Sequence, residues 1–457
     1  MLVKKIGIKL LAVVALLLPV VAEAQTSSVN AFSPYTMYGI GEQNTPGTLR
    51  MRSMGGVGIA AREASMVNLL NPAASSAAPR KTFLFSFGLE GQNYYNKQTV
   101  NEVEKHSAYN TFNIHDVALQ MPLAKRLGLS LSLHPYSSVG YRTSYYHDLN
   151  SDLTGQVGPM LYTYQGEGDI TEVKLGVGWE VFKNFSIGAA VQYYWGEIER
   201  NFVMAPTSIV GEGSYLSTVG LDQYDISSFK GQVGVQWNLI FNPKRILTLG
   251  ATFDFGGDLK PTQTSLIYNA NNNSTEVKNE EEQLSLVLPY QAGVGLFYRT
   301  AKWAFGVDYI YQNWGGRNKE SIKTGLSGSD ATDYYTVAYT NTNTIKAGVE
   351  FTPNRYDVRH LLKRWSYRLG FRYGTYNQTF NGEYLDQYAV TAGIGIPVKF
   401  FGISMIDVGV EYGLRGTNLA PKLGLVSQQY FKFGVGFSLF ACAAENNEYW
   451  FTRPKYD

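Results

Sequence analysis

The chain has 457 residues, with 39 Lys and Arg against 37 Asp and Glu, and it contains a single cysteine. This near-neutral balance excludes the basic surface that nucleic-acid binding requires. One cysteine excludes an intramolecular disulfide framework and any metal site built from several cysteines. The 33 Tyr, 24 Phe and 47 Gly residues favour a membrane barrel with aromatic bands at its two interfaces.

Residues 1–24 have the pattern of a secretory signal peptide. Three lysines precede an apolar run over residues 10–22, and Ala22-Glu23-Ala24 forms a small-x-small cleavage site. The apolar run is too short to span a bilayer comfortably. We therefore expect an exported chain that begins at Gln25. Without the signal's three Lys and one Glu, it carries 36 cationic and 36 acidic residues.

Residues 25–81 form a distinct N-terminal region that is rich in small residues. The stretch RSMGGVGIAAREASMVNLLNPAASSAAP, which ends at Pro79, is weakly helical and too short to be a domain. It cannot bury its apolar face alone, whereas the wall of a wide barrel would enclose it. We expect this region to be an extension and hatch, made of short helices, that plugs a barrel lumen.

The residues that follow alternate with a period of two, which is typical of barrel strands. From Trp303 to Tyr311 every odd position is apolar, and the runs from Trp365 and from Phe431 alternate in the same way. Beyond the signal there is no apolar run of about 18 residues, so no transmembrane helix is expected. The expected strand cores are 82–95, 108–121, 127–147, 160–181, 185–201, 223–241, 246–268, 284–299, 302–314, 336–352, 365–378, 385–399, 403–415 and 428–440.

These cores predict an all-β fold, an antiparallel membrane-spanning β-barrel of about 14 strands over residues 82–440. A soluble β-sandwich would also alternate. However, the connections here alternate between short and long, as periplasmic turns and external loops do. Short connections occur near residues 183, 243 and 301, and long ones include 202–222 and 315–341. Residues 441–457 would form a periplasmic tail.

A proline interrupts the third predicted strand. Pro135 lies within His134-Pro135-Tyr136-Ser137-Ser138, and Gly140 follows. Proline removes a ladder donor and occurs in sheets at edges or bulges. The pattern therefore predicts a kink or local opening in the wall, and a simple bulge near a strand end is the alternative.

The hatch region and the barrel pattern together resemble the FadL/TodX family of outer-membrane transporters for fatty acids and other hydrophobic compounds. The resemblance rests on Asn71-Pro72-Ala73, preceded by Gly55, Gly56, Ala60, Ala61 and Ala64, and on the strands behind it. It implies a lateral opening at the kinked third strand, with the hatch packed against it. On this basis we expect Asn71 to supply hydrogen bonds to the segment His134–Ser138.

Inward-facing cations would be the groups that meet a ligand carboxylate. Sidedness along the strands makes Lys346, Arg368 and Arg372 the candidates. No catalytic residue, cofactor or metal is expected. The GxGxxA match from Gly56 lacks the preceding strand that a dinucleotide site needs, and the five histidines show no metal-ligand spacing.

The favoured function is passive uptake of hydrophobic compounds such as long-chain fatty acids, with exit through the lateral opening. The alternative is a structural, assembly or secretion-associated barrel that acts through periplasmic or surface protein partners. A general porin is disfavoured by the hatch. Either way we expect a monomeric barrel in the outer membrane of a Gram-negative-type cell, in contact with its lipid.

Overall fold

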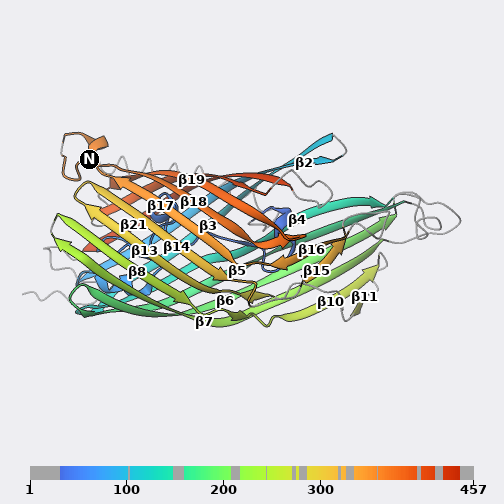
Figure 1. Ribbon diagram of the computed structural model, residues 1–457, viewed down its shortest axis with the longest axis horizontal. Coiled ribbons are helices and arrows are strands. Elements are labelled where there is room, and N and C mark those ends of the chain that lie inside the picture. Colours follow the sequence, from blue (N-terminus) through green and yellow to red (C-terminus); the bar gives the residue numbers. More distant parts are fainter. Residues whose placement is uncertain are drawn as a thin grey trace, which may run out of the picture.

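A computed structural model gives the architecture (Figure 1). It describes residues 31–100, 103–147, 159–206, 217–242, 244–269, 274–276, 286–316, 321–325, 334–357, 359–398, 403–416 and 426–442. The predicted signal peptide, and the predicted tail from residue 443 onward, lie outside these residues.

Fourteen long strands of the described chain form a closed antiparallel barrel. Each strand pairs with its neighbour along the chain, and the first pairs with the last from Thr82↔Cys442 to Lys97↔Ser427. The predicted all-β architecture and strand number are therefore confirmed. The strands are β2 (Thr82–Val100), β3 (Val103–Ala124), β4 (Leu127–His147), β5 (Met160–Phe182), β6 (Phe185–Pro206), β7 (Thr218–Asn242), β8 (Arg245–Asp254), β13 (Tyr290–Thr300), β14 (Trp303–Asn313), β17 (Thr342–Phe351), β18 (Ser366–Phe380), β19 (Glu383–Val398), β20 (Ile403–Arg415) and β21 (Ser427–Cys442).

Shorter elements lie inside the barrel or at its ends. The N-terminal region contributes η1 (Pro34–Met37), β1 (Glu42–Gln43), α2 (Leu49–Arg52) and η2 (Pro72–Ala77). The connections contribute β9 (Gly257–Asp258), β10 (Thr262–Asn269), β11 (Ser274–Glu276), β12 (Val287–Leu288), β15 (Ser321–Gly325), β16 (Tyr334–Tyr339) and η3 (Leu361–Arg364).

Two expected strands are each divided in the structure. The expected core 246–268 becomes β8 and β10, because β8 ends at Asp254, β9 pairs with β12, and Leu259 is buried before the chain pairs with β7. The returning strand β10 pairs with β7 alone among the barrel strands. The expected core 336–352 becomes β16 and β17, and both of these strands pair with β18.

The predicted alternation between an outer and an inner face is present along the wall. On β14, Trp303, Phe305 and Val307 are exposed, whereas Ala304 and Asp308 are buried. The exposed apolar face suits hydrocarbon, and the inner face packs against other parts of the chain. No helix among the described residues is long and apolar enough to cross a membrane.

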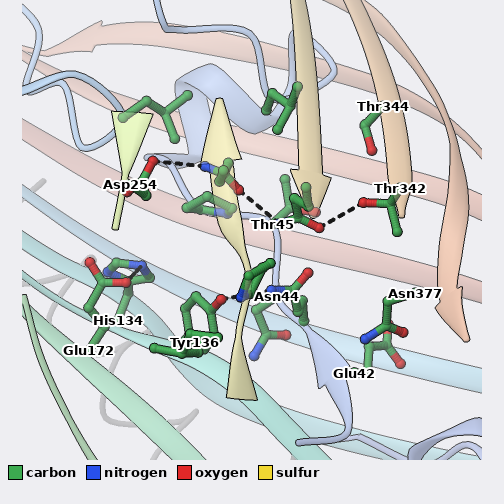
Figure 2. A pocket seen from close by; sticks show the side chains of 18 of the residues that line it. Glu42, Asn44, Thr45, His134, Tyr136, Glu172, Asp254, Thr342, Thr344 and Asn377 are labelled. Carbon is green, nitrogen blue, oxygen red and sulfur yellow. Dashed lines mark hydrogen bonds and ion pairs between the residues drawn. The ribbon is translucent and has the colours of Figure 1, made fainter. Parts of the chain in front are cut away.

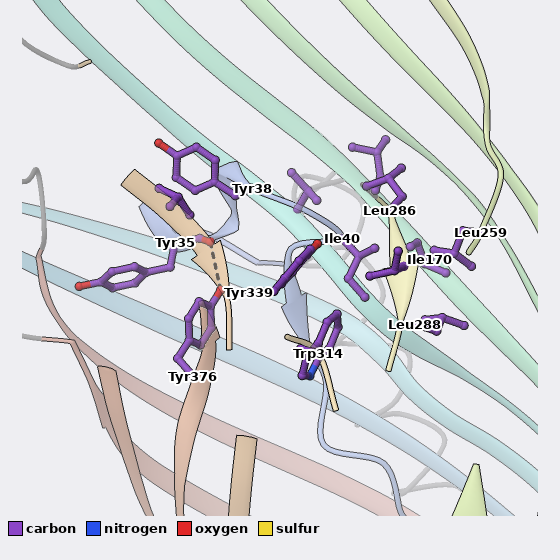
Figure 3. Close-up of a cluster of buried hydrophobic side chains, with 14 of the residues drawn as sticks. Tyr35, Tyr38, Ile40, Ile170, Leu259, Leu286, Leu288, Trp314, Tyr339 and Tyr376 are labelled. Carbon is purple, nitrogen blue, oxygen red and sulfur yellow. Dashed lines mark hydrogen bonds between the residues drawn. The ribbon is translucent and has the colours of Figure 1, made fainter. Parts of the chain in front are cut away.

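The half of the lumen toward the long loops is filled by an apolar cluster (Figure 3). Side chains reach it from the N-terminal region, from the wall and from the β9–β12 ribbon. Tyr35, Ile40, Leu288 and Trp314 belong to it, and Tyr376 Oη donates a hydrogen bond to the Tyr35 carbonyl oxygen at 3.0 Å. This cluster packs the N-terminal region against the wall in the long-loop half of the barrel.

Candidate functional site

The N-terminal region sits against inward-facing glycines of the wall. A Cβ at Gly188, Gly234 or Gly370 would collide with Ala73, with the Asn71 side chain or with Gly55, respectively. These three glycines belong to β6, β7 and β18, so the region contacts several sides of the lumen. Glycine is needed here because no side chain fits between wall and segment.

Asn71 is bound within the N-terminal region and to the far wall. Its side-chain oxygen accepts a hydrogen bond from the Ala73 amide at 3.0 Å and so caps η2, in which Pro72 is the first residue. Its amide nitrogen donates to the carbonyl oxygens of Ile59 at 2.9 Å and Val235 at 3.1 Å. The expectation that Asn71 serves the kinked strand was wrong, because these groups already use its donors and acceptor.

Buried ion pairs hold the N-terminal region to β17. Arg50 donates to both carboxylate oxygens of Glu350, at 2.9 and 3.0 Å, and also to Glu63. Glu350 in turn accepts from Arg368 at 2.7 Å, and Arg299 approaches Glu63 at 3.2 Å. Burial raises the pKa of Glu63, but the guanidiniums of Arg50 and Arg299 outweigh it and hold that pKa below its usual range. Both carboxylates of this network, Glu350 and Glu63, are therefore paired with arginines.

Further charged contacts tie the same region to other strands. Arg415 of β20 pairs with Glu42 of β1 at 2.6 Å, and Arg52 pairs with Glu90 of β2. On β14 the Asp308 carboxylate accepts the Gly58 and Ile59 amides at 2.7 and 3.0 Å. Sequence reasoning missed these acids. A signal for them was present in the sequence. Acidic residues occupy inward-facing positions on strands expected to lie near the inward-facing arginines, which indicates buried ion pairs.

The pairing between β3 and β4 is interrupted. The two strands pair only from Ala124↔Leu127 to Val117↔Leu133, and in the rest of their described length they do not pair with each other. Beyond Leu133, β4 still pairs with β5, with a register shift between Pro135 and Ser137. The structure thus places the end of the β3–β4 pairing next to the predicted kink.

The N-terminal region covers the edge of β4 that β3 leaves. In β1, Glu42 pairs with Ser138 and Gln43 with Ser137. The Asn44 amide donates to the Tyr136 carbonyl oxygen at 2.9 Å.

Further hydrogen bonds join the N-terminal region to this part of β4. The Ser33 amide donates to the Gly140 carbonyl oxygen at 2.8 Å, and Gln43 Nε2 donates to Tyr136 Oη at 2.8 Å. This edge of β4 is therefore paired with residues 33–44 of the same chain.

A cavity of about 190 Å³ lies beside this covered edge (Figure 2). His134 and Glu172 approach to 3.7 Å on one side of it. Most of the side chains around it are polar or charged. They include Glu42, Asn44, Thr45, His134, Tyr136, Glu172, Lys174, Gln192, Asp254, Gln291, Gln312, Thr342, Lys346, Arg372, Arg415 and Lys432. A purely apolar ligand would have to strip water from these groups without replacing their hydrogen bonds.

The three candidate cations occupy different surroundings. Arg368 has no exposed side-chain surface and is fully engaged, by Glu350 and by Asp407 at 2.5 Å. Arg372 lines the cavity but pairs with Glu411 at 2.5 Å. Lys346 is buried and also lines the cavity. Contact with a ligand carboxylate stays a prediction, and the geometry favours Lys346 over the two arginines.

In the described ranges, no group of three or more His, Cys, Asp or Glu side chains could hold a metal ion. His134, which is followed by Ser137 and Ser138 in the sequence, lies 3.7 Å from Glu172 and lines the cavity.

Comparisons with solved structures identify the same fold in outer-membrane channels. The CymD monoaromatic hydrocarbon channel is 14% identical, with 88% of this chain and 100% of that chain covered and a TM-score of 0.57. The Ralstonia pickettii toluene transporter TbuX is 16% identical, with 86% and 98% covered and a TM-score of 0.55. A Pseudomonas aeruginosa FadL homologue is 14% identical, with 87% and 98% covered and a TM-score of 0.55.

These likenesses confirm the resemblance to FadL and TodX at the level of fold. A comparison with curated proteins found no match. The family comparison is more specific, because a family described as BamG matches residues 2–457 and so covers nearly the whole sequence. The chain therefore belongs to the BamG family.

Proposed function

We propose that this protein is an outer-membrane barrel with a closed lumen that acts through protein partners. The proposal is supported by the packing of the N-terminal region against the inner wall of the barrel. Buried ion pairs hold residues 31–79 to the wall, and an apolar cluster fills the end toward the long loops. The cavity of about 190 Å³ beside β4 is lined mostly by polar and charged side chains, so it is poorly suited to carry hydrophobic compounds.

The stretch of β3 from Val103 to Asp116, which does not pair with β4, supports a role in binding a partner. Within this stretch Phe112 and Ile114 are apolar and are 43% and 53% exposed. This part of β3 therefore continues the lipid-facing band. At that depth an unpaired backbone group costs several kcal/mol. An extended segment of a neighbouring protein could satisfy these groups by adding a strand.

Site-specific photo-crosslinking in intact cells tests the proposal. A photoreactive phenylalanine analogue is placed at Phe112, in the stretch of β3 that does not pair with β4. In a matched variant it is placed at Phe433. Phe433 is equally exposed, at 48%, but lies on β21, which pairs on both sides. We expect a discrete protein adduct from position 112 and none from position 433. Identical patterns, or adducts with lipid alone, would contradict the proposal.

A second candidate is passive passage of hydrophobic compounds through the interruption beside β4. It is supported by the position of the polar cavity next to His134 and Tyr136, where residues 33–44 cover the edge of β4. In this mechanism β1 moves aside and the ligand leaves laterally into the outer leaflet. The solved channels of similar fold, described as carrying toluene or monoaromatic hydrocarbons, support the same candidate.

Two measurements distinguish the candidates. Mass spectrometry of compounds extracted with the folded barrel should find a stoichiometric hydrophobic ligand only if the barrel carries one. Glu42→Gln removes the ion pair with Arg415 that holds β1. It should raise uptake of a labelled fatty acid if β1 is the gate, and unchanged uptake would count against passage by this route.

A further inference from the structure

The connection between β17 and β18 differs from the other turns at its end of the barrel. The neighbouring turns between paired strands are short, for example Phe182 to Phe185 and Thr300 to Trp303. The β17–β18 connection instead runs from Phe351 to Ser366 and contains the helix η3. Figure 1 shows it in orange at the upper left, outside the outline of the barrel.

The described residues of this connection form an ordered structure. The Asn354 amide donates to the Lys363 carbonyl oxygen at 2.8 Å, which closes the loop. The Asp357 carboxylate accepts the Arg359 and His360 amides at 2.9 and 2.7 Å. Tyr367 Oη donates to the Leu362 carbonyl oxygen at 3.0 Å and ties η3 to the barrel wall. The side chains of the connection are therefore presented in a defined arrangement.

Those side chains are amphipathic. Tyr356, Leu361 and Leu362 are 90%, 69% and 60% exposed, although they are large and apolar. Beside them stand four cations. Asp357, which caps the turn and lies 3.9 Å from Lys363, is the acidic residue among the described positions between 352 and 365. The cations are Arg355, Arg359, Lys363 and Arg364. Exposed apolar residues among cations mark a surface that binds a partner with both apolar and anionic groups.

The same combination recurs around this rim of the barrel. The turns after β3, β5, β7 and β13 carry exposed cations and no acidic residue: Lys125, Arg126, Lys183, Lys244, Arg245 and Lys302. Exposed apolar side chains adjoin them, including Leu123, Phe182 and Phe241. Near the β17–β18 connection, Trp303 packs on Phe351 with ring centroids 4.2 Å apart, at the level where the lipid-facing band ends.

We propose that the β17–β18 connection inserts into the inner leaflet of the outer membrane and, with the basic rim, binds anionic phospholipid headgroups. A leaflet fits better than a protein partner because it alone surrounds the barrel and meets every turn at once. Leu361 and Leu362 enter the acyl boundary, and the neighbouring cations contact phosphates. The inference assumes the outer-membrane location but is independent of which function proposed above is correct.

Retention of phospholipid by the purified full-length barrel tests this inference. Native mass spectrometry follows phosphatidylglycerol bound after extraction from nanodiscs of phosphatidylglycerol and phosphatidylethanolamine. The triple variant Arg359→Gln/Lys363→Gln/Arg364→Gln should bind phosphatidylglycerol at least about tenfold more weakly, given the attraction of each cation to an anionic surface. The control, Lys105→Gln/Arg142→Gln/Lys260→Gln, removes three exposed cations from the opposite end and should retain wild-type binding.

A second readout reports insertion without altering the cations. Leu361→Cys in a Cys442→Ser background carries an environment-sensitive fluorophore, whose emission should shift to the blue in nanodiscs and not in detergent-free amphipol. Equal phosphatidylglycerol retention by both triple variants, together with an unshifted probe, would overturn the inference. So would loss of a co-purifying protein from the turn variant while its lipid binding stays unchanged, because the surface would then be a protein interface.

Discussion

Removing Arg50 should release the N-terminal region from the wall. In Arg50→Ala, Glu350 and Glu63 lose the guanidinium that joins them. Breaking a buried pair by removing one partner typically costs about 3–5 kcal/mol. Here Glu350 keeps Arg368 and Glu63 keeps Arg299, so the value should lie near the lower end, about 3 kcal/mol. The population in which the region is undocked should then rise by roughly a hundredfold.

Thiol labelling measures that population. Ala60 is fully buried in the N-terminal region, so Ala60→Cys in a Cys442→Ser background reacts only when the region leaves the wall. The labelling rate should rise by roughly a hundredfold with Arg50→Ala and by less than about fivefold with Arg355→Ala. Arg355 contacts the same Glu350 at 3.6 Å but is largely exposed. A rate that changes equally little in both variants would refute the reasoning.

Three further outcomes are expected. Gly370→Ala places a methyl group against Gly55 and should destabilise the docked region by about 1–3 kcal/mol. Gly231→Ala makes only ordinary van der Waals contacts and should not destabilise it. Limited proteolysis of the folded barrels compares the two variants. Asn71→Ala loses the η2 cap and should weaken the region by about 1 kcal/mol without blocking heat-modifiable barrel assembly on gels. Deleting residues 50–78 should raise conductance in planar bilayers, and a deleted form no leakier than the parent would show that these residues do not close the lumen.

The barrel was predictable because its strands obey one local rule. A strand between lipid and a filled lumen must alternate, so Trp303 to Tyr311 shows its sidedness without any knowledge of its neighbours. The division of the strand after Asp254 was missed because a local pattern does not show which strands pair. β8 pairs with β7 and β13, whereas β10 pairs with β7 and β11.

The lumen was less predictable because its contacts depend on register between distant segments. Arg368 was recognised as inward-facing, but its engagement follows from Glu350 lying directly opposite on β17, and from Asp407 on β20. The docking of β1 on β4 has no local signal, since two residues carry no period. Asn71 was assigned to the wrong partner for the same reason.

Closure of the wall has a consequence for the order in which the molecule folds. The ring is completed when β2 pairs with β21. Because β21 is the last strand of the wall to be synthesised, this pairing forms only after the other strands have been made. Residues 31–79 precede β2 and lie against glycines that leave no room for a Cβ. A finished ring would admit this segment only by threading it past packed side chains at one end. We therefore expect residues 31–79 to dock before β2 pairs with β21, so that the wall closes around a segment already in place.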